Sequence, residues 1–554
     1  MIRKIRITSQ ILFFSLFTGL FFFVNRYPTA YTHDSDILLK LNPFSALIVS
    51  IASREVISSM VIGASIVLII SMVFGRIFCG FFCPLGALID FFDTYLFNKY
   101  RSKKRIPPSS LHHVKYIILS VSLLLAVTGV TLSLVLDPLA ITTRLYTIIA
   151  YPTMQAIVAL GSQAYQKTLS FLHIDLFNYP KILQPLMYGT AGAIGLFILT
   201  FCGGLIDKRF YCQYLCPTGA FLAIVSRFSF FRRVATTCNN CAVCSHTCPT
   251  HAINETDCTK TAVSECILCG KCDLSRPCSR LKLVIPDLQS GIGININKRH
   301  SILALAGTFL LTPVFKFTAM ARYDGTGRFI RPPGAVPEVS FSARCIACGE
   351  CIKVCPMNAL QPAFGPQQIH RAFTPQLVPR IGGCEEKCYL CGHVCPTEAI
   401  RSLTLAEKRY AKIGTAVIDL HRCIAWEQNR ECLVCDEVCP YNAIEFKILP
   451  TVKGLFKVPI VREDLCVGCG LCEQKCPVFD EAAIVVYRFG ENRIFRGQYL
   501  TDFQKQSIEN RRKQINDRTA DINTAAVPLQ DKSPGIQPEK PVQQHSLPPG
   551  FSFD

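Results

Sequence analysis

The sequence contains neither a G-x-G-x-x-G fingerprint nor a P-loop, so nothing in it indicates a nucleotide or flavin cofactor. Acidic residues are scarce, with 39 Asp and Glu against 58 Lys and Arg, for a net charge of +19. The basic residues stand in short clusters beside apolar runs, as at Lys99–Arg105 and at Arg232 and Arg233. This pattern is typical of the cytoplasmic flanks of membrane helices, and we therefore expect no nucleic-acid partner.

The apolar residues are spread unevenly along the 554-residue chain. Half of all residues are hydrophobic, which is a high share for a soluble protein. Four apolar runs reach or approach the roughly 20 residues of a bilayer-crossing helix. They cover about residues 9–25, 56–75, 114–136 and 186–206. The sequence therefore predicts an α-helical membrane bundle of four helices over residues 1–230, in contact with membrane lipid.

Basic clusters mark alternate ends of these runs and favour the cytoplasmic side. They predict a multi-pass protein of a bacterial inner (cytoplasmic) membrane. Residues 76–113 and 207–300 are expected inside, and residues 26–55 and 137–185 outside. The run 41–51 is too short to span and is expected to lie at the outer surface.

A further apolar run, Ser301–Phe315, stands between Lys298-Arg299 and Ala319-Met320-Ala321. The segment 297–321 is either an export-signal-like segment or a buried or interfacial linker, and we favour a fifth transmembrane helix. Residues 503–554 are polar, lack periodicity and are expected to be disordered.

Of the 30 cysteines, 24 fall into six sets that follow C-x2-C-x2-C-x3-C-P or a near variant of it. The sets are Cys238, Cys241, Cys244 and Cys248; Cys266, Cys269, Cys272 and Cys278; Cys345, Cys348, Cys351 and Cys355; Cys384, Cys388, Cys391 and Cys395; Cys423, Cys432, Cys435 and Cys439; Cys466, Cys469, Cys472 and Cys476. Zinc sites pair C-x2-C motifs over long gaps, and disulfide scaffolds are short, so neither explains this repeat. The pattern predicts about six [4Fe-4S] clusters.

In such two-cluster modules three cysteines of a tight loop bind one cluster and the fourth binds the other. The sequence therefore predicts three α+β modules of the bacterial 2[4Fe-4S] ferredoxin type. One, the two-cluster module, covers residues 231–290, and two form the four-cluster domain at residues 330–500. The predicted crossing cysteines are Cys248, Cys278, Cys355, Cys395, Cys439 and Cys476. Cys258 is an alternative to Cys278 as a crossing cluster ligand. Trp426 is expected to pack over a cluster.

A second repeat, R-x-aromatic-C-x3-C-P-x-G-A, begins at Arg76 and again at Arg209. It contributes Cys79, Cys83, Cys212 and Cys216, and it suggests a duplicated helical hairpin with pseudo-two-fold packing. Both motifs are expected to emerge at the cytoplasmic face. The four thiols could hold a metal or an additional cluster, form a dithiol pair, face a quinone, or only shape packing. Cys202 is expected to be a small buried apolar residue.

Residues 1–280 resemble the membrane ferredoxin-type subunit of periplasmic nitrate reductase systems, the NapH type, and its methylamine-utilisation relative of the MauN type. The features that carry this resemblance are the four predicted helices, the two C-x3-C-P motifs and the two-cluster module that follows them. Residues 297–500 resemble the partner polyferredoxin of the NapG/MauM type, from Arg331-Pro-Pro-Gly-Ala335, Glu338 and Phe341 onward. Two features depart from these families: Lys298-Arg299 replaces the twin arginine of an export signal, and Cys272-x5-Cys278 lengthens one cysteine gap.

The resemblance implies a fusion of two subunits that act together as a quinol dehydrogenase, an oxidoreductase-type electron-transfer assembly. It implies oxidation of quinol, with menaquinol as the expected substrate, and transfer through the clusters to a c-type cytochrome or periplasmic reductase. The C-terminal polyferredoxin would then be periplasmic. Asp93, Asp137 and Arg144 are candidate polar groups of a quinol pocket. The alternative is a membrane ferredoxin that reduces a metal such as copper or assists enzyme maturation, with the four C-x3-C-P cysteines as its working site.

Overall fold

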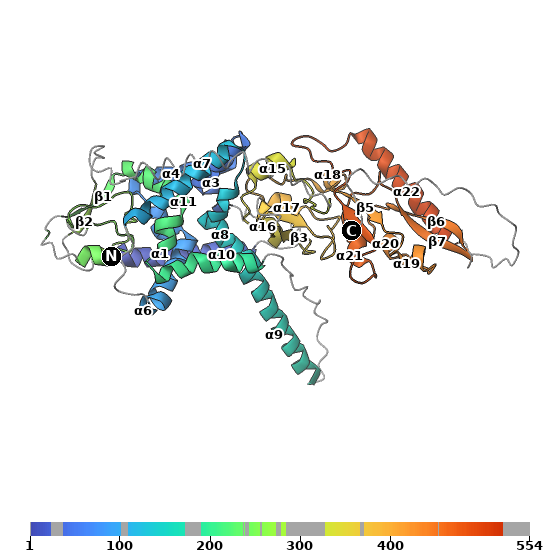
Figure 1. Cartoon of the computed structure of the whole chain (residues 1–554), viewed down its shortest axis with the longest axis horizontal. Helices are drawn as coiled ribbons and strands as arrows, with labels where there is room; N and C mark the ends of the chain where they lie inside the picture. Colours follow the sequence, from blue (N-terminus) through green and yellow to red (C-terminus); the bar gives the residue numbers. More distant parts are fainter. Residues whose placement is uncertain are drawn as a thin grey trace.

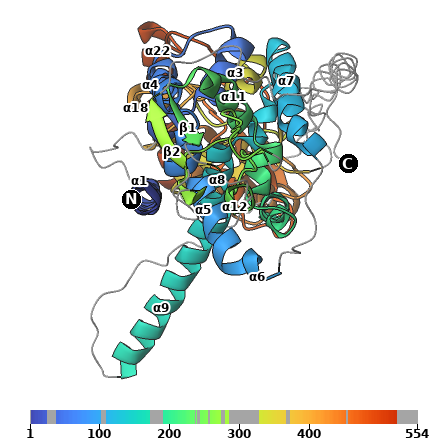
Figure 2. The same ribbon diagram turned by 90° about the vertical axis from the view of Figure 1, so that its left-hand side faces the viewer.

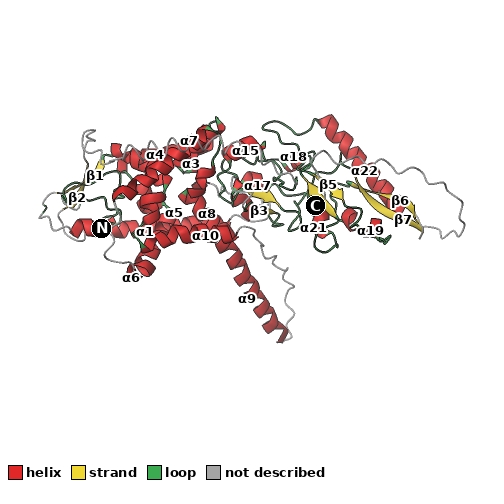
Figure 3. Ribbon diagram, viewed as in Figure 1, coloured by secondary structure: helices red, strands yellow, loops and turns green. Residues whose placement is uncertain are grey.

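The computed structural model describes residues 2–23, 37–100, 109–171, 190–235, 238, 243–254, 257–272, 279–283, 327–365, 371–451 and 454–524. A helical bundle lies between the two-cluster module at one end of the long axis and the four-cluster domain at the other (Figure 1). Helices dominate the middle of the molecule, and the short strands lie toward its ends (Figure 3). The predicted fifth helix at 297–321 lies outside the described residues.

The bundle forms helices at each of the four predicted apolar runs. Its α-helices are α1 (Ile2–Phe23), α2 (Ile37–Lys40), α3 (Pro43–Ser53), α4 (Ser58–Phe74), α5 (Pro84–Phe92), α6 (Asn98–Tyr100), α7 (Val114–Val127), α8 (Pro138–Leu145), α9 (Tyr151–Phe171), α10 (Thr190–Cys202) and α11 (Pro217–Val225). Within the described part of the chain, the single helix long and apolar enough to cross a bilayer is Arg3–Phe22, accompanied by four shorter apolar helices. Helix α9 projects away from the body of the molecule (Figure 2).

Shorter 3-10 and π turns connect these helices. They are η1 (Phe78–Phe82), η2 (Asp93–Phe97), η3 (Ser109–His113), η4 (Leu132–Leu136), η5 (Tyr146–Ala150), η6 (Gly203–Leu205), η7 (Tyr211–Leu215) and η8 (Ser226–Phe228). Helices α5 and α11 each begin with a proline directly after a π turn. Proline suits a first helical position, since the amide hydrogen it lacks would have no partner there. The internal repeat in the sequence is thus also a repeat in structure.

Helix α3 covers the run 41–51 and lies where the bundle meets the four-cluster domain; its predicted place at the outer side of a membrane stays a prediction. Phe44 and Ile48 have no exposed surface, and the helix packs against α4, α7 and α15 of the four-cluster domain. Its sequence is apolar on every face, and a helix of that kind is stable only when it is covered on all sides. Length excluded a crossing but did not distinguish a surface helix from a buried one.

The two-cluster module contains β1 (Phe231–Ala235), β2 (Ser279–Leu283) and α12 (Val243–Thr247), with the two strands antiparallel. An ion-pair network docks it on the bundle. Both carboxylate oxygens of Glu265 accept from Lys115 Nζ, at 2.5 and 2.6 Å, and Arg76 Nη1 donates to the same carboxylate at 2.9 Å. Gln213 adds a hydrogen bond to the Pro249 carbonyl oxygen at 3.1 Å.

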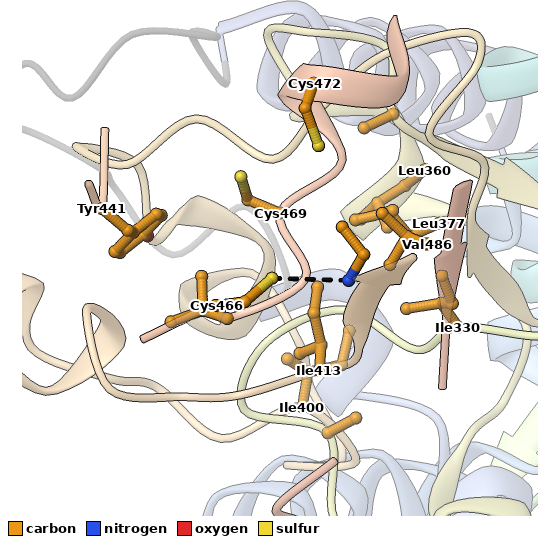
Figure 4. Packing of buried hydrophobic residues seen from close by; sticks show 14 of the residues in the cluster. Ile330, Leu360, Leu377, Ile400, Ile413, Tyr441, Cys466, Cys469, Cys472 and Val486 are labelled. Atoms are coloured by element: carbon orange, nitrogen blue, oxygen red, sulfur yellow. Dashed lines mark hydrogen bonds between the residues drawn. The ribbon is translucent and has the colours of Figure 1, made fainter. Parts of the chain in front are cut away.

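The four-cluster domain is a set of short elements around a core rich in cysteine. Its strands are β3 (Leu360–Pro362), β4 (Pro375–Leu377), β5 (Thr415–Ile418), β6 (Ile444–Thr451), β7 (Gly454–Val461) and β8 (Ile484–Tyr487), paired antiparallel as β3-β4, β5-β8 and β6-β7. Its helices are α15 (Glu338–Arg344), α16 (Glu350–Lys353), α17 (Leu390–His393), α18 (Leu405–Lys408), α19 (Ile424–Glu427), α20 (Val434–Glu437), α21 (Leu471–Lys475) and α22 (Asp502–Thr524). Cys466, Cys469 and Cys472 lie among apolar side chains such as Ile413 and Val486 (Figure 4).

Helix α22 corrects the prediction that disorder begins at residue 503. It packs on the domain through Ile508, and the Arg512 guanidinium lies 5.0 Å from the Tyr441 ring centroid. Composition alone missed this helix because few anchoring contacts suffice when the rest of a helix is solvated. The remaining tail, 525–554, lies outside the described residues.

The four-cluster domain docks on the opposite end of the bundle from the two-cluster module. Thr131 Oγ1 donates to the Ser342 and Cys345 carbonyl oxygens at 2.7 and 3.0 Å, and Arg344 pairs with Glu55. The Arg144 guanidinium lies 5.1 Å from the Phe373 ring centroid. These contacts lie next to the first cysteine loop of the domain.

A half-buried carboxylate, Glu338, holds the start of the four-cluster domain together. Glu338 pairs with Arg331 at 2.7 Å, Arg493 at 2.7 Å and Arg371 at 3.3 Å. Burial opposes its charge, but the three arginines outweigh that effect and hold the pKa of this carboxyl well below its usual range.

We predict that Glu338→Gln destabilises the folded domain by roughly 3 kcal/mol at neutral pH, since it leaves the buried Arg331 without its ionic partner. A carboxyl with a lowered pKa stabilises the fold above its unfolded-state pKa and loses that contribution as pH falls. The gap between wild type and variant should therefore narrow in acid. Thermal unfolding followed by cluster absorbance measures it, with the exposed Glu463→Gln as control. An equal loss in both variants would contradict the prediction.

Candidate iron–sulfur sites and the four-cysteine cavity

Four cavities in the ferredoxin-like parts are each lined by three cysteines of one loop and the fourth of another. Their volumes are about 340 to 470 Å³. The sets are Cys266, Cys269, Cys272 with Cys248; Cys345, Cys348, Cys351 with Cys395; Cys423, Cys432, Cys435 with Cys476; and Cys466, Cys469, Cys472 with Cys439. In all four, the structure brings together the crossing pattern predicted from spacing.

The fifth set, Cys384, Cys388 and Cys391 with Cys355, is also brought together. Burial raises the pKa of the Cys355 thiol to about 11, and the nearby thiols Cys384 and Cys388 add to the shift. Thiols that are this hard to ionise alone become favourable ligands when a metal centre replaces their protons, since the metal supplies the opposing charge.

The sixth set is described only in part, because Cys241 and Cys278 lie outside the described residues. Cys244 and Cys248 are buried in one cluster with Cys258, and Cys238 packs against it. The structure thus gives Cys258, the rival of Cys278 for the fourth ligand, a position beside this set. The choice between Cys258 and Cys278 stays a prediction.

Backbone amides point at the crossing cysteines. The amide hydrogens of Ala252, Ile400 and Ala443 are donated to the sulfurs of Cys248, Cys395 and Cys439, with N···S distances of 3.4, 3.5 and 3.4 Å. Hydrogen bonds to ligand sulfur stabilise the extra electron of a reduced cluster and so raise its potential.

The cysteine loops have two further features. The glycines after Cys348 and Cys469, Gly349 and Gly470, have φ angles of +88° and +82°, which favour a residue without a Cβ. Trp426 packs against the buried apolar group that contains Cys423 and donates its indole hydrogen to the Pro459 carbonyl oxygen at 3.1 Å. Its packing over a bound cluster stays a prediction.

A fifth cavity of about 340 Å³ lies inside the bundle and is lined by Cys79, Cys83, Cys212 and Cys216. The rest of its wall is formed by Arg76, Phe78, Leu85, Pro138, Thr218 and Gly219. Cys83 and Cys216 are buried and belong to the same apolar cluster as Ile346 and Cys348 of the four-cluster domain. The four cysteines thus converge inside the bundle, and the cytoplasmic side expected for both motifs stays a prediction.

The chain has a residue with positive φ just before each π turn, at Gly75, whose φ is +71°, and at Arg209, whose φ is +50°. In each repeat the π turn contains the first cysteine and the second cysteine follows it, and the amide of the second cysteine donates to the carbonyl oxygen five residues earlier. These bonds, Cys83 to Phe78 and Cys216 to Tyr211, are each 2.9 Å long. Isolated π turns are frequent at functional sites.

Sequence reasoning missed the charged network around this cavity. Arg209 pairs with Asp90 at 2.6 Å and donates to the Cys79 carbonyl oxygen at 3.1 Å, and Arg6 pairs with the same aspartate. The arginine that opens each repeat motif was the available signal. Its partners, Asp90 and Glu265, lie outside the motifs and could not be assigned from spacing.

Other candidate residues have structural roles. Asp137 caps α8 and accepts from Asn42 and Thr218, while Arg144 donates to the Val135 carbonyl oxygen at 2.6 Å. Asp93 accepts from the Arg209 backbone amide at 2.7 Å. Cys202 is exposed on α10, so the prediction that it is buried is wrong; the outward face of α10 also carries Ile198 and Leu199.

Comparison with known proteins agrees with this geometry. The family model "4Fe-4S binding domain" matches residues 57–107 and 188–238, and "4Fe-4S dicluster domain" matches residues 344–399 and 430–479. The first pair of matches contains the two C-x3-C-P motifs. The second pair lies in the four-cluster domain.

Relatives cover about a third of this chain. The methylamine utilization ferredoxin-type protein MauM of Methylophilus methylotrophus is 37% identical over 183 residues, which are 32% of this chain and 80% of the relative. The ferredoxin-type protein NapG of Escherichia coli is 35% identical over 169 residues, 29% of this chain and 71% of the relative. The ferredoxin-type protein NapF of the same organism is 33% identical over 170 residues, 29% of this chain and 93% of the relative. The chain belongs to the MauM/NapG family of ferredoxin-type, [4Fe-4S]-binding electron-transfer proteins.

Proposed function

We propose that this chain joins a NapH/MauN-type membrane subunit to its MauM/NapG-type polyferredoxin. It would serve as the electron-transfer part of a quinol dehydrogenase in an inner-membrane, nitrate-reductase-like respiratory system. Quinol, with menaquinol as the expected form, is the donor. A c-type cytochrome or a periplasmic reductase is the acceptor.

The observation that carries this proposal is the placement of cysteine-rich parts at both ends of one helical bundle (Figure 1). Glu265, next to Cys266, is held by Arg76 and Lys115 of the bundle. At the far end, Thr131 holds the backbone of Cys345 itself. Each ferredoxin part is thus fixed to the bundle at the loop that carries its cysteines, which suits a carrier that passes electrons along the bundle.

The contacts also agree with the sidedness expected from the basic clusters. The bundle residues that hold the two-cluster module include Arg76 and Gln213, in or next to segments expected inside. Those that hold the four-cluster domain include Glu55 and Arg144, in segments expected outside. A bundle of this kind in a membrane would leave the four-cluster domain in the periplasm. The chain would cross once more between residues 283 and 327, where the apolar run 301–315 lies.

The chemistry balances as quinol → quinone + 2 H⁺ + 2 e⁻. Clusters, when bound, take up and release one electron each, so the two electrons leave the quinol separately. The chain's own contribution is to fix the cysteine loops relative to one another, to shield them with apolar side chains, and to direct amide hydrogens at the sulfurs. Rigid placement keeps the transfer distances constant, and apolar cover keeps water from reorganising around each electron.

Metal handling is the second candidate, and the convergence of Cys79, Cys83, Cys212 and Cys216 on one cavity favours it. A membrane ferredoxin that reduces copper for enzyme maturation would use these thiols. The large four-cluster domain is more than that task requires.

We predict that a reduced menaquinol analogue, added anaerobically to detergent-purified protein, reduces the clusters, and that a quinone-site inhibitor blocks this reduction. EPR spectroscopy measures it, and dithionite gives the full signal as a control for cluster content. Complete clusters that respond to dithionite but to no quinol would overturn quinol oxidation. Copper bound at the C-x3-C-P cysteines in that case would favour the second candidate.

We also predict opposite sides for the two ferredoxin parts. Alkaline phosphatase, which is active only outside the cytoplasm, should be active when fused after Thr524 and inactive when fused after Leu283. A green fluorescent protein that folds only inside should give the reverse pattern at the same two sites. Equal alkaline phosphatase activity at both fusion sites would contradict the proposed topology.

A further inference from the structure

We propose that Cys79, Cys83, Cys212 and Cys216 hold one more [4Fe-4S] cluster, ligated by two cysteines from each half of the internal repeat. This cluster would link the two-cluster module to the four-cluster domain through the interior of the bundle. Its role as a link rests on the electron-transfer function proposed above, but its presence does not.

The cavity has the size and walls of the cluster cavities elsewhere in the chain. Its volume of about 340 Å³ equals that of the cavity lined by Cys439, Cys466, Cys469 and Cys472. Within the described residues, no three His, Cys, Asp or Glu side chains converge closely enough to hold a single ion, here or at the cluster cavities. A cavity of this size that is lined by four cysteines suits a [4Fe-4S] cluster, which is held by four cysteine thiolates.

Two helix N-termini point at the cavity. Cys83 and Cys216 are the N-cap residues of α5 and α11, helices of nine residues each. The amides of Gly86 and Gly219 donate to their sulfurs at 3.4 and 3.2 Å. A helix N-terminus stabilises negative charge, which a thiolate-ligated cluster carries. The same bond in both halves places a thiolate ligand at each end of a pseudo-two-fold site.

The two repeat arginines reach across this pseudo-symmetry axis. A Cβ built on Gly219 would lie 2.9 Å from Arg76 Nη2, and one built on Gly86 would lie 3.8 Å from Arg209 Nη2. Each arginine thus packs on the C-P-x-G turn of the other half.

Arg76 also supplies an independent sign of a missing anionic group. Its side chain is 2% exposed and lines the cavity, and its Nε atom is buried with no hydrogen-bond partner in the described structure. A buried donor without a partner costs free energy, and an anionic cluster in the cavity would offset that cost.

Both neighbours of the cavity carry cluster ligands. A Cβ on Gly80, between Cys79 and Cys83, would lie 2.7 Å from the carbonyl oxygen of Ile267, which stands between Cys266 and Cys269. Cys83 and Cys216 also belong to an apolar cluster of the bundle that extends to Cys348 of the four-cluster domain. The site therefore lies beside the Cys266 loop and is joined to the Cys348 loop by continuous apolar packing. Without it, an electron would have to cross the bundle in one step.

The test is iron content of the full-length chain purified anaerobically. Seven clusters predict about 28 iron atoms per chain and six predict about 24. The double variant Cys79→Ala, Cys212→Ala should lose about four iron atoms and an equal amount of acid-labile sulfide. Cys202→Ala, an exposed cysteine on the same bundle, is the matched control and should lose none. Copper and zinc are measured in the same samples.

A wild-type content of about 24 iron atoms overturns the proposal, as does a double variant that keeps its iron or loses one copper or zinc ion instead. The wild-type count does not depend on whether the variant folds. Mössbauer and EPR spectra of the remaining clusters separate the loss of one site from general misfolding, and the single variant Cys212→Ala offers a milder change. None of these readouts uses quinol, so a failure of quinol oxidation would leave this result standing.

If the cluster forms and links the two ferredoxin parts, its removal should also slow electron transfer between them. After one pulse of reductant, the two-cluster module and the four-cluster domain should equilibrate in wild type and in Cys202→Ala. In the double variant they should exchange electrons at least tenfold more slowly, as followed by freeze-quench EPR. Equal rates with the iron lost would remove the linking role while leaving the site itself.

Discussion

Buried ion pairs between the repeat arginines and acidic residues of other segments fix the positions of the two repeats, the N-terminal helix and the two-cluster module relative to one another. Arg209 and Asp90 tie the second repeat to the first, and Arg6 brings in the N-terminal helix. Arg76 and Glu265 tie the bundle to the two-cluster module. Such pairs are costly to form in an apolar interior and costly to break once formed, since a lone buried charge has no substitute for water. The positions of the four bundle cysteines and of the loop at Cys266 all follow from these contacts.

The ferredoxin-like parts depend on a different constraint. The core of the four-cluster domain mixes cysteines with larger apolar residues, as where Cys466 and Cys469 lie beside Val486 (Figure 4). A cavity lined by four thiols leaves little apolar contact across its centre. Metal binding and folding are coupled in sites of this kind, because the ligands are scattered until the group that they share is present.

The cysteine spacing was enough to predict which loops would meet, because crossed ligation is dictated by the geometry of the two-cluster module. The position of Trp426 near Cys423 could also be predicted, because it lies in the loop between two cysteines of one set. The convergence of Cys79 and Cys216 on one cavity could not be predicted from spacing. Spacing shows that the two motifs are alike, but it does not show how the chain turns at Gly75 and Arg209. Hydrophobicity gave the wrong exposure for Cys202, and it could not show which parts of the protein cover helix α3. An apolar residue is stable both in a protein core and at a surface that contacts lipid. Whether it is buried or exposed therefore depends on residues distant in sequence.

The contacts of Thr131 with the backbone of Cys345 and of Glu55 with Arg344 join parts of a single chain. Association between them is therefore intramolecular, at an effective concentration that does not fall when the protein is scarce. An interface that would dissociate on dilution if its partners were separate can stay closed here with few specific contacts. The covalent link therefore lets a few contacts keep the cysteine loop in a fixed position over the bundle.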